Sequence, residues 1–209
     1  MARKWIGYIG VGSLMCATLG CGILYIRQVR LQQAISDKVL RFHVLANSDS
    51  EADQTLKLAV RDRVLQEYGD LLETCTSKEE TLAALKNAQQ EISETAEAEV
   101  LAQGYTYPVR VSLVREEFPF KKYGDLIFPA GVYDALRIEI GEAKGKNWWC
   151  VLYPQMCYVD AAWGYSTEES HVRLQNTLTK EEFLVVSAME QKKVTPKIKC
   201  RLVELWSER

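Results

Sequence analysis

The stretch from Gly141 to Asp160, GEAKGKNWWCVLYPQMCYVD, constrains the fold of this chain most strongly. It begins with a turn rich in glycine and lysine, whose residues suit tight, solvated backbone turns. A short apolar run from Trp148 to Tyr153 follows and ends at Pro154. An apolar run of this length between turn residues is typical of a buried strand. We therefore expect this stretch to supply a strand that anchors the core.

Two cysteines of this stretch are placed to form a disulfide. Cys150 and Cys157 lie on either side of Pro154, and a chain that folds back there brings the sulfurs within bridging range. Trp148 and Trp149 are interpreted as structural core residues, because buried aromatic side chains contribute large apolar areas. The prediction is a Cys150–Cys157 disulfide beside two core tryptophans.

The remaining cysteines leave alternatives open. Cys16 and Cys21 lie in the apolar N-terminal segment, and Cys75 and Cys200 lie in the body. An even number of cysteines in an exported domain permits further disulfides. Cys200, on the inward side of a predicted strand, is equally well explained as a buried apolar thiol. The pairing of Cys75 and Cys200 therefore stays open.

The segment from Trp5 to Ile26 contains 22 consecutive uncharged residues. As a helix it is about 33 Å long, enough to cross a bilayer core of about 30 Å. This is longer than the apolar core of a typical signal peptide, and no small-x-small cleavage site follows it. We expect residues 1–30 to be a signal or membrane-anchor segment, and we favour an uncleaved transmembrane anchor. Cleavage of the segment, or lipidation at Cys21, stays open as an alternative. Residues 31–209 then form one domain, exported if the N-terminus stays in the cytoplasm.

Charge limits the partners of this domain. The chain carries a net charge of -2, and its first 30 residues hold four basic and no acidic side chains, so the remainder carries -6. A mildly acidic body argues against nucleic acid as a partner. About 180 residues are enough for one domain with a substantial core.

Hydrophobic periodicity places strands and helices in blocks. Alternation predicts a half-buried strand over 39–46, with Arg41 and His43 facing away from the core. A helix follows, and the sequence offers two capping boxes for its start, Ser48 with Glu51 and Ser50 with Asp53. Two further capping boxes, Ser77 with Glu80 and Thr179 with Glu182, predict the start of a second and a third helix. The other expected strands cover residues 107–115, 135–140, 148–153 and 197–205.

The strands at 135–140 and 148–153 are expected to form a hairpin across the glycine and lysine turn. Residues 118–125, in which aromatic and basic side chains alternate, are expected to form a loop. Blocks of helices and strands, without strict alternation, favour an α+β fold. We expect a mostly antiparallel sheet of about five strands packed by two to three helices.

Two polar stretches are candidate partner-binding surfaces. A polar loop between a strand end and a helix start commonly binds ligands. Ordinary helix capping explains every polar residue of the first stretch except His43. The candidate residues are His43, Asn47, Ser48 and Asp49 in the first stretch and Phe120, Lys121, Tyr123 and Asp125 in the second.

Catalytic chemistry finds little support in the sequence. Cys150 and His43 are the pair that would serve as nucleophile and base, but a disulfide would consume the thiol. No phosphate-binding loop, metalloprotease motif or dinucleotide fingerprint occurs, and the cysteine spacing is poor for zinc. We therefore expect no catalytic residues, metal, cofactor or small-molecule substrate. The alternatives are an envelope thiol enzyme that uses Cys150, or a structural envelope protein.

Three stretches resemble the stage II sporulation protein R family of endospore-forming bacteria. They are LRFHVLANSDSEADQTLKLAVRD at 40–62, YGDLIFPAGVYDALRIEIGEAKGKNWWCVLYPQMCYVD at 123–160, and KIKCRLVELW at 197–206, which is similar to the closing strand of the family. Residues 161–196 match no part of the family that we can place, so their role stays open.

The resemblance implies an exported developmental signal. Members of the family are made in the forespore and exported into the space between the two sporulation membranes. There they trigger a membrane-embedded aspartic protease of the mother cell, a sigma-factor-processing peptidase. The protease then cleaves the inactive precursor of an early mother-cell sigma factor, sigma-E. The resemblance therefore implies an activator without proteolytic chemistry of its own.

Overall fold

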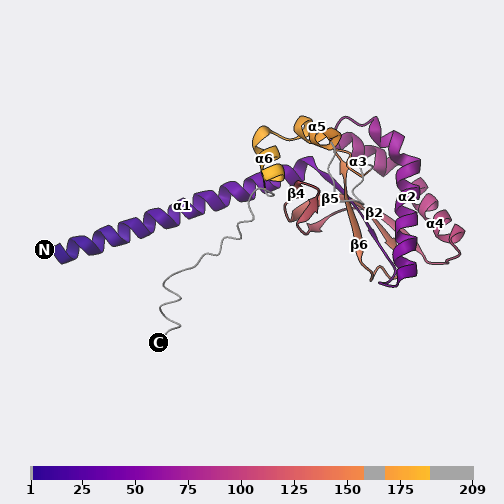
Figure 1. Ribbon diagram of the computed structural model, residues 1–209, viewed down its shortest axis with the longest axis horizontal. Helices are drawn as coiled ribbons and strands as arrows, with labels where there is room; N and C mark the ends of the chain where they lie inside the picture. Colours follow the sequence, from indigo (N-terminus) through magenta and orange to yellow (C-terminus); the bar gives the residue numbers. More distant parts are fainter. Residues whose placement is uncertain (1, 158–167, 189–209) are drawn as a thin grey trace.

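The computed structural model describes residues 2–157 and 168–188, with side chains from Thr18 onward. The strand predicted at 197–205 lies outside these residues. Figure 1 shows a sheet between two layers, with α1 projecting away from the body. The elements are α1 (Ala2–Lys38), β1 (Leu40–Leu45), α2 (Glu51–Glu73), α3 (Lys78–Asn87), α4 (Gln89–Ala102), β2 (Val109–Phe118), β3 (Lys121–Tyr123), β4 (Leu126–Phe128), β5 (Gly131–Ile140), β6 (Asn147–Tyr153), α5 (Glu168–Thr177) and α6 (Lys180–Ala188).

The main sheet is mixed, with the strand order β2-β5-β1-β6. β1 pairs in parallel with β5 and antiparallel with β6, while β2 pairs antiparallel with β5. The predicted hairpin between β5 and β6 is therefore wrong, because β1 lies between them. β1 is buried on both faces, as is usual for a central strand. β3 and β4 form a separate two-stranded sheet.

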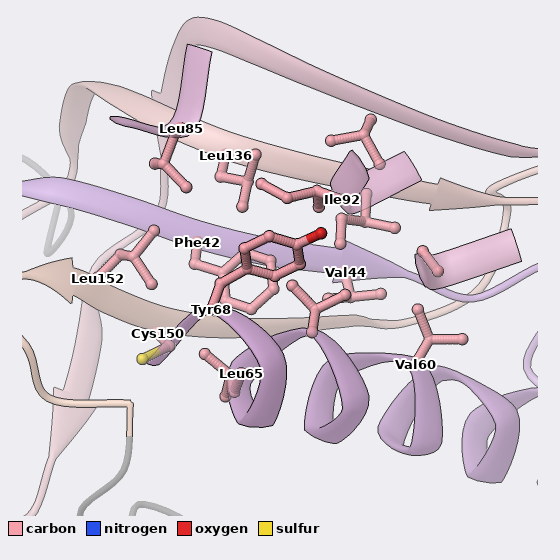
Figure 2. Close-up of a cluster of buried hydrophobic side chains, with 14 of the residues drawn as sticks. Phe42, Val44, Val60, Leu65, Tyr68, Leu85, Ile92, Leu136, Cys150 and Leu152 are labelled. Atoms are coloured by element: carbon pink, nitrogen blue, oxygen red, sulfur yellow. The ribbon is translucent and has the colours of Figure 1, made fainter. Parts of the chain in front are cut away.

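One face of the main sheet is covered by α2, α3 and α4 (Figure 1). The apolar stripe of α2 packs against the strands as its four-residue spacing predicts. Ser50 is the N-cap of α2, and its hydroxyl accepts a hydrogen bond from the Asp53 amide at 3.1 Å. Figure 2 shows this core, with labels on Phe42, Val44, Val60, Leu65, Tyr68, Leu85, Ile92, Leu136, Cys150 and Leu152.

The second predicted helix is divided into α3 and α4. Ser77 caps α3 as expected, accepting a hydrogen bond from the Glu80 amide at 3.1 Å. The break falls at Ala88, whose φ of -88° and ψ of 3° depart from helical values. Alanine is the best helix former, so the sequence carries no signal for this break.

The other face of the sheet packs against the last turns of α1, the β3–β4 hairpin, α5 and α6. The capping box predicted at the start of α6 is present. The Thr179 amide donates to the Glu182 carboxylate at 2.7 Å, and the Glu182 amide donates to the Thr179 hydroxyl at 3.3 Å. Lys38, at the end of α1, forms an ion pair with Glu182 at 2.6 Å. α1 is thereby fixed to the body at its C-terminal end.

α1 is a single helix of 37 residues that runs through the predicted boundary at residue 30 into the body. Ile35 is fully buried there, whereas the large apolar side chains from Leu19 to Val29 are exposed. Over the described residues, no helix combines the length and the apolar character needed to cross a membrane. The transmembrane anchor at 5–26 stays a prediction. From Thr18 onward, the exposed large apolar residues of α1 are Leu19, Ile23, Leu24, Tyr25, Ile26 and Val29.

Candidate functional site

β1 carries two polar side chains, Arg41 and His43, on the face of the sheet opposite α2. Both are buried, with 0% and 3% of their surface exposed. The prediction that β1 is half-buried is therefore wrong, and His43, a candidate partner-binding residue, is buried. Alternation correctly separates the two faces of the strand, but it cannot show that a second layer covers the polar one.

Arg41 lies in a cage of four aromatic rings. Its guanidinium carbon is 5.1 Å from the ring centre of Phe118, 5.3 Å from Phe128, 5.4 Å from Tyr133 and 5.5 Å from Tyr123. Nη2 donates to the Tyr123 hydroxyl at 3.0 Å, whereas Nε and Nη1 have no hydrogen-bond partner within the described residues. Burial lowers the pKa of Arg41. The rings replace a carboxylate as the main stabilising contact of this cation.

A chain of ionic contacts continues from His43 across the sheet. His43 Nε2 lies 2.6 Å from a carboxylate oxygen of Glu116 on β2. Arg137 on β5 donates to the other oxygen of Glu116 at 3.1 Å and lies 3.4 Å from Glu139. Arg110, at the start of β2, contacts Glu139 at 3.2 Å. Both carboxylates therefore already have cationic or imidazole partners inside the protein.

The imidazole of His43 is neutral at physiological pH. Burial, together with the positive charges of Arg137 and Arg41, lowers its pKa to about 3. Its contact with Glu116 is accordingly a close approach of a neutral ring to a carboxylate and not an ion pair. A neutral, buried histidine is poorly suited to bind a partner directly.

Trp149 on β6 links the two predicted surfaces. Its ring stacks on His43 with centroids 4.8 Å apart and meets Phe118 edge to face at 4.8 Å. The ammonium of Lys121 lies 5.2 Å from the centre of the same ring. His43 and Lys121, which come from separate stretches of the sequence, thus contact one side chain.

We call the group Ser112, His43, Glu116, Arg137, Glu139 and Trp149 the polar sheet face. Pairing of the strands places Ser112, Arg137, His43 and Trp149 in one row across all four strands. A second hydrophobic cluster lies on the side of the sheet opposite α2, and it includes Tyr133, Ala135 and Val151 from the part of the sheet next to this row. His43 is buried, but the other side chains of the polar sheet face are half-buried and reach solvent.

The stretch predicted as a loop at 118–125 is a strand end followed by a hairpin. Phe118 is the last residue of β2 and is buried, and Lys121 begins β3. Phe120 between them is exposed. Asp125, in the turn of the hairpin, lies 3.2 Å from His171 Nε2 on α5. Of the second predicted surface, Lys121 is the residue that contacts the polar sheet face, through Trp149.

Asn47 and Asp49 hold another part of the chain in place. The Asn47 side-chain oxygen accepts a hydrogen bond from the Glu142 amide at 2.9 Å, and the Asp49 carboxylate accepts one from the Lys146 amide at 2.7 Å. These bonds fix the β5–β6 connection against the β1–α2 loop. Their polar groups are used inside the protein, but to hold this connection and not to cap α2, whose N-cap is Ser50.

Ser48 belongs to the same junction. Its hydroxyl donates to the Asp53 carboxylate at 2.5 Å, and its backbone carbonyl lies so close to Gly145 that a Cβ there would be 2.2 Å from the oxygen. Hydrogen bonds from Ser48 and Asn47 lower the pKa of Asp53. Glycine at 145 is therefore required by a close backbone approach.

The predicted disulfide is present. Cys150 and Cys157 are bonded, with a Cα–Cα distance of 5.6 Å. Cys150 is opposite Phe42 on β1 and faces α2, whereas the next residue of β1, His43, faces the other side of the sheet. A catalytic pair of Cys150 and His43 is therefore excluded by the geometry as well as by the bond.

The adjacent tryptophans serve opposite faces of the sheet. Trp148 packs against the first cluster and meets Phe42 edge to face with ring centres 5.7 Å apart. The guanidinium carbon of Arg61 on α2 lies 4.8 Å from the centre of its ring. Trp149 packs against the second cluster.

Sequence reasoning missed Arg41, Glu116 and Arg137. The available signal was the charged residues that alternate with apolar ones in three separate strands. Without the strand order, nothing shows that these charges meet. Over residues 2–157 and 168–188, no group of histidine, cysteine and acidic side chains is arranged to hold a metal ion.

Comparison with known proteins identifies the family. The family model of stage II sporulation protein R matches residues 36–163. The stage II sporulation protein R of Bacillus subtilis (strain 168) is 33% identical over 184 residues, which cover 83% of this chain and 82% of that protein. The chain belongs to the stage II sporulation protein R family. The region matched by the family model contains β1 through β6, and hence the whole polar sheet face. No solved structure matches the chain.

Proposed function

We propose that this protein is an exported signalling protein of sporulation. It activates a membrane-embedded aspartic protease of the mother cell, which then cleaves the precursor of sigma-E. Membership of the stage II sporulation protein R family carries this proposal. The family match covers the sheet and its polar face, so the proposal assigns signalling to this domain.

Two features of the body support recognition over catalysis. The buried thiol that a cysteine enzyme would need is consumed in the Cys150–Cys157 bond. His43 is held neutral by burial and by the positive charges of Arg137 and Arg41, and it faces away from Cys150. Such a domain acts on its target by binding.

The proposed location is the space between the forespore and mother-cell membranes. Structural disulfides persist in oxidising compartments outside the cytoplasm, which agrees with the Cys150–Cys157 bond. Residues 5–26 deliver the chain to that space as a secretion signal or membrane anchor. The exposed apolar side chains along α1, from Leu19 to Val29, are suited to an apolar environment that the isolated chain does not supply.

Activation requires that the domain bind the active form of the protease more tightly than the inactive form. A ligand shifts an equilibrium only by its differential affinity for the two states. A preference of 100-fold, about 2.7 kcal/mol, turns a protease that is 1% active into one that is about half active. One binding surface of ordinary size is sufficient for this effect.

Co-expression in a non-sporulating bacterium tests the proposal. The host makes the protease, the sigma-E precursor and this protein, and cleavage of the precursor is measured on immunoblots. We expect cleavage with the full chain and none when the protein is omitted. A variant that lacks residues 1–30 and stays in the cytosol is the matched control and should give no cleavage. Absence of cleavage with the exported full chain, or equal cleavage with the cytosolic variant, would refute the proposal.

A further inference from the structure

The polar sheet face contains hydrogen-bond donors that the described protein does not satisfy. The buried Nε of Arg137 and the Ser112 hydroxyl have no partner there. Behind them, Nε and Nη1 of Arg41 also lack acceptors. Buried polar groups in proteins are nearly always hydrogen-bonded. The three unpaired guanidinium nitrogens, which belong to Arg137 and Arg41, can only donate, so the group that would complete the face is an acceptor.

The charge of this region is positive. His43 is neutral and adds no charge. The two carboxylates are already engaged by arginine and His43, whereas the ammonium of Lys121 lies over an aromatic ring. The cations are Arg41, Arg110, Lys121 and Arg137, and the anions are Glu116 and Glu139. An acidic ligand is therefore complementary to this face, although the body as a whole is acidic.

The dimensions of the row indicate a chain and not a single ion. The row from Ser112 to Trp149 crosses three strand spacings, or about 14 Å. An extended peptide covers that length with about four residues. A single carboxylate or phosphate would occupy one position only. Trp149 at one end offers a half-buried aromatic ring on which an apolar side chain can pack.

We propose that the polar sheet face binds an extended acidic segment of the protease that this protein activates. Carboxylates of that segment pair with Lys121 and Arg137, and an apolar side chain packs on Trp149. Arg41 stays covered by its aromatic cage and contributes positive potential from below. This inference rests on the proposed function, since it names the surface through which activation occurs.

Charge reversal at Lys121 tests the surface in the co-expression host. Lys121→Glu should reduce precursor cleavage at least tenfold, and Lys121→Gln should have a smaller effect. Lys86→Glu, an exposed position on α3 at the opposite side of the sheet, makes the same charge change and should stay within twofold of the unmodified chain. A thermal melt of each purified full-length variant separates loss of binding from loss of folding.

Photo-crosslinking identifies what lies on the face. Benzoylphenylalanine replaces Arg110, which is 74% exposed at the rim of the polar sheet face, or Leu101, which is 64% exposed on α4. We expect the probe at position 110 to capture a protease segment rich in aspartate and glutamate, and the probe at position 101 to capture none. Capture of lipid alone, or of a segment without acidic residues, would overturn the inference.

The outcomes also separate this inference from the proposed function. If the unmodified chain gives no cleavage, the proposed function fails. If the unmodified chain gives cleavage and the folded Lys121→Glu variant is as active as Lys86→Glu, the function stands and the polar sheet face is not the contact.

Discussion

Breaking the Cys150–Cys157 disulfide should destabilise the domain by an amount that the loop length sets. The bond closes a loop of eight residues, since the two cysteines are seven positions apart. The entropy lost by the unfolded chain on closing such a loop corresponds to about 2.5 kcal/mol at 25 °C. Cys150→Ala and Cys157→Ala should each lower the free energy of unfolding by about this amount. The Cys150→Ala variant loses somewhat more, because this sulfur is buried in the core.

Urea unfolding followed by tryptophan fluorescence measures these losses. Trp148 and Trp149 lie directly beside Cys150, so their emission reports on this part of the sheet. The double variant should be little less stable than Cys150→Ala alone, because the two ends of one bond act as a unit. Losses of the single variants that add up in the double variant would refute the reasoning. So would a reductant that leaves the stability of the unmodified protein unchanged.

Three further changes test other parts of the structure. Gly145→Ala places a Cβ against the Ser48 carbonyl and should lower the free energy of unfolding by about 1–3 kcal/mol, measured in urea; an unchanged midpoint would contradict the close approach. The pKa of His43 is depressed from 6.5 to about 3, so below pH 6.5 the unfolded chain binds a proton that the folded protein does not. The free energy of unfolding should therefore fall by about 1.4 kcal/mol per pH unit as the pH drops from 6.5 toward 3. His43→Gln should flatten this slope in urea titrations, and an equal slope in both proteins would show that His43 is not its source. Arg41→Met removes a buried cation that has no carboxylate partner within the described residues and should leave the stability unchanged or raise it, because the contacts with the rings do not outweigh the cost of burying the charge. A loss above about 2 kcal/mol would contradict this balance.

Local signals in the sequence predicted the local structure well. The apolar spacing of α2 and the caps at Ser77 and Thr179 are confirmed, because each depends on residues within one or two helical turns. The Cys150–Cys157 bond was predictable for the same reason, since a proline separates two nearby cysteines. These features need no knowledge of distant parts of the chain.

Features that depend on distant pairing could not be predicted. β1 lies between β5 and β6 although it precedes β5 by about 90 residues in the sequence, and nothing in the glycine and lysine turn reveals this insertion. The burial of Arg41 depends on rings from β2, β3, β4 and β5. The role of Asn47 depends in the same way on the Glu142 amide.

The candidate surface illustrates the same limit. His43 and Lys121 were both identified from the sequence, but as parts of separate surfaces. Trp149, which joins them, was predicted only as a core residue. The strand order and the fold of the β3–β4 hairpin bring the three together.

Reconstitution with purified components tests most directly whether this protein acts by binding alone. The protease is placed in lipid vesicles with the sigma-E precursor, and increasing amounts of the purified full chain are added while cleavage is measured. We expect cleavage to rise and saturate as the protease becomes fully bound, and we expect no cleavage from this chain without the protease. Cleavage of the precursor by the purified chain alone would contradict the account.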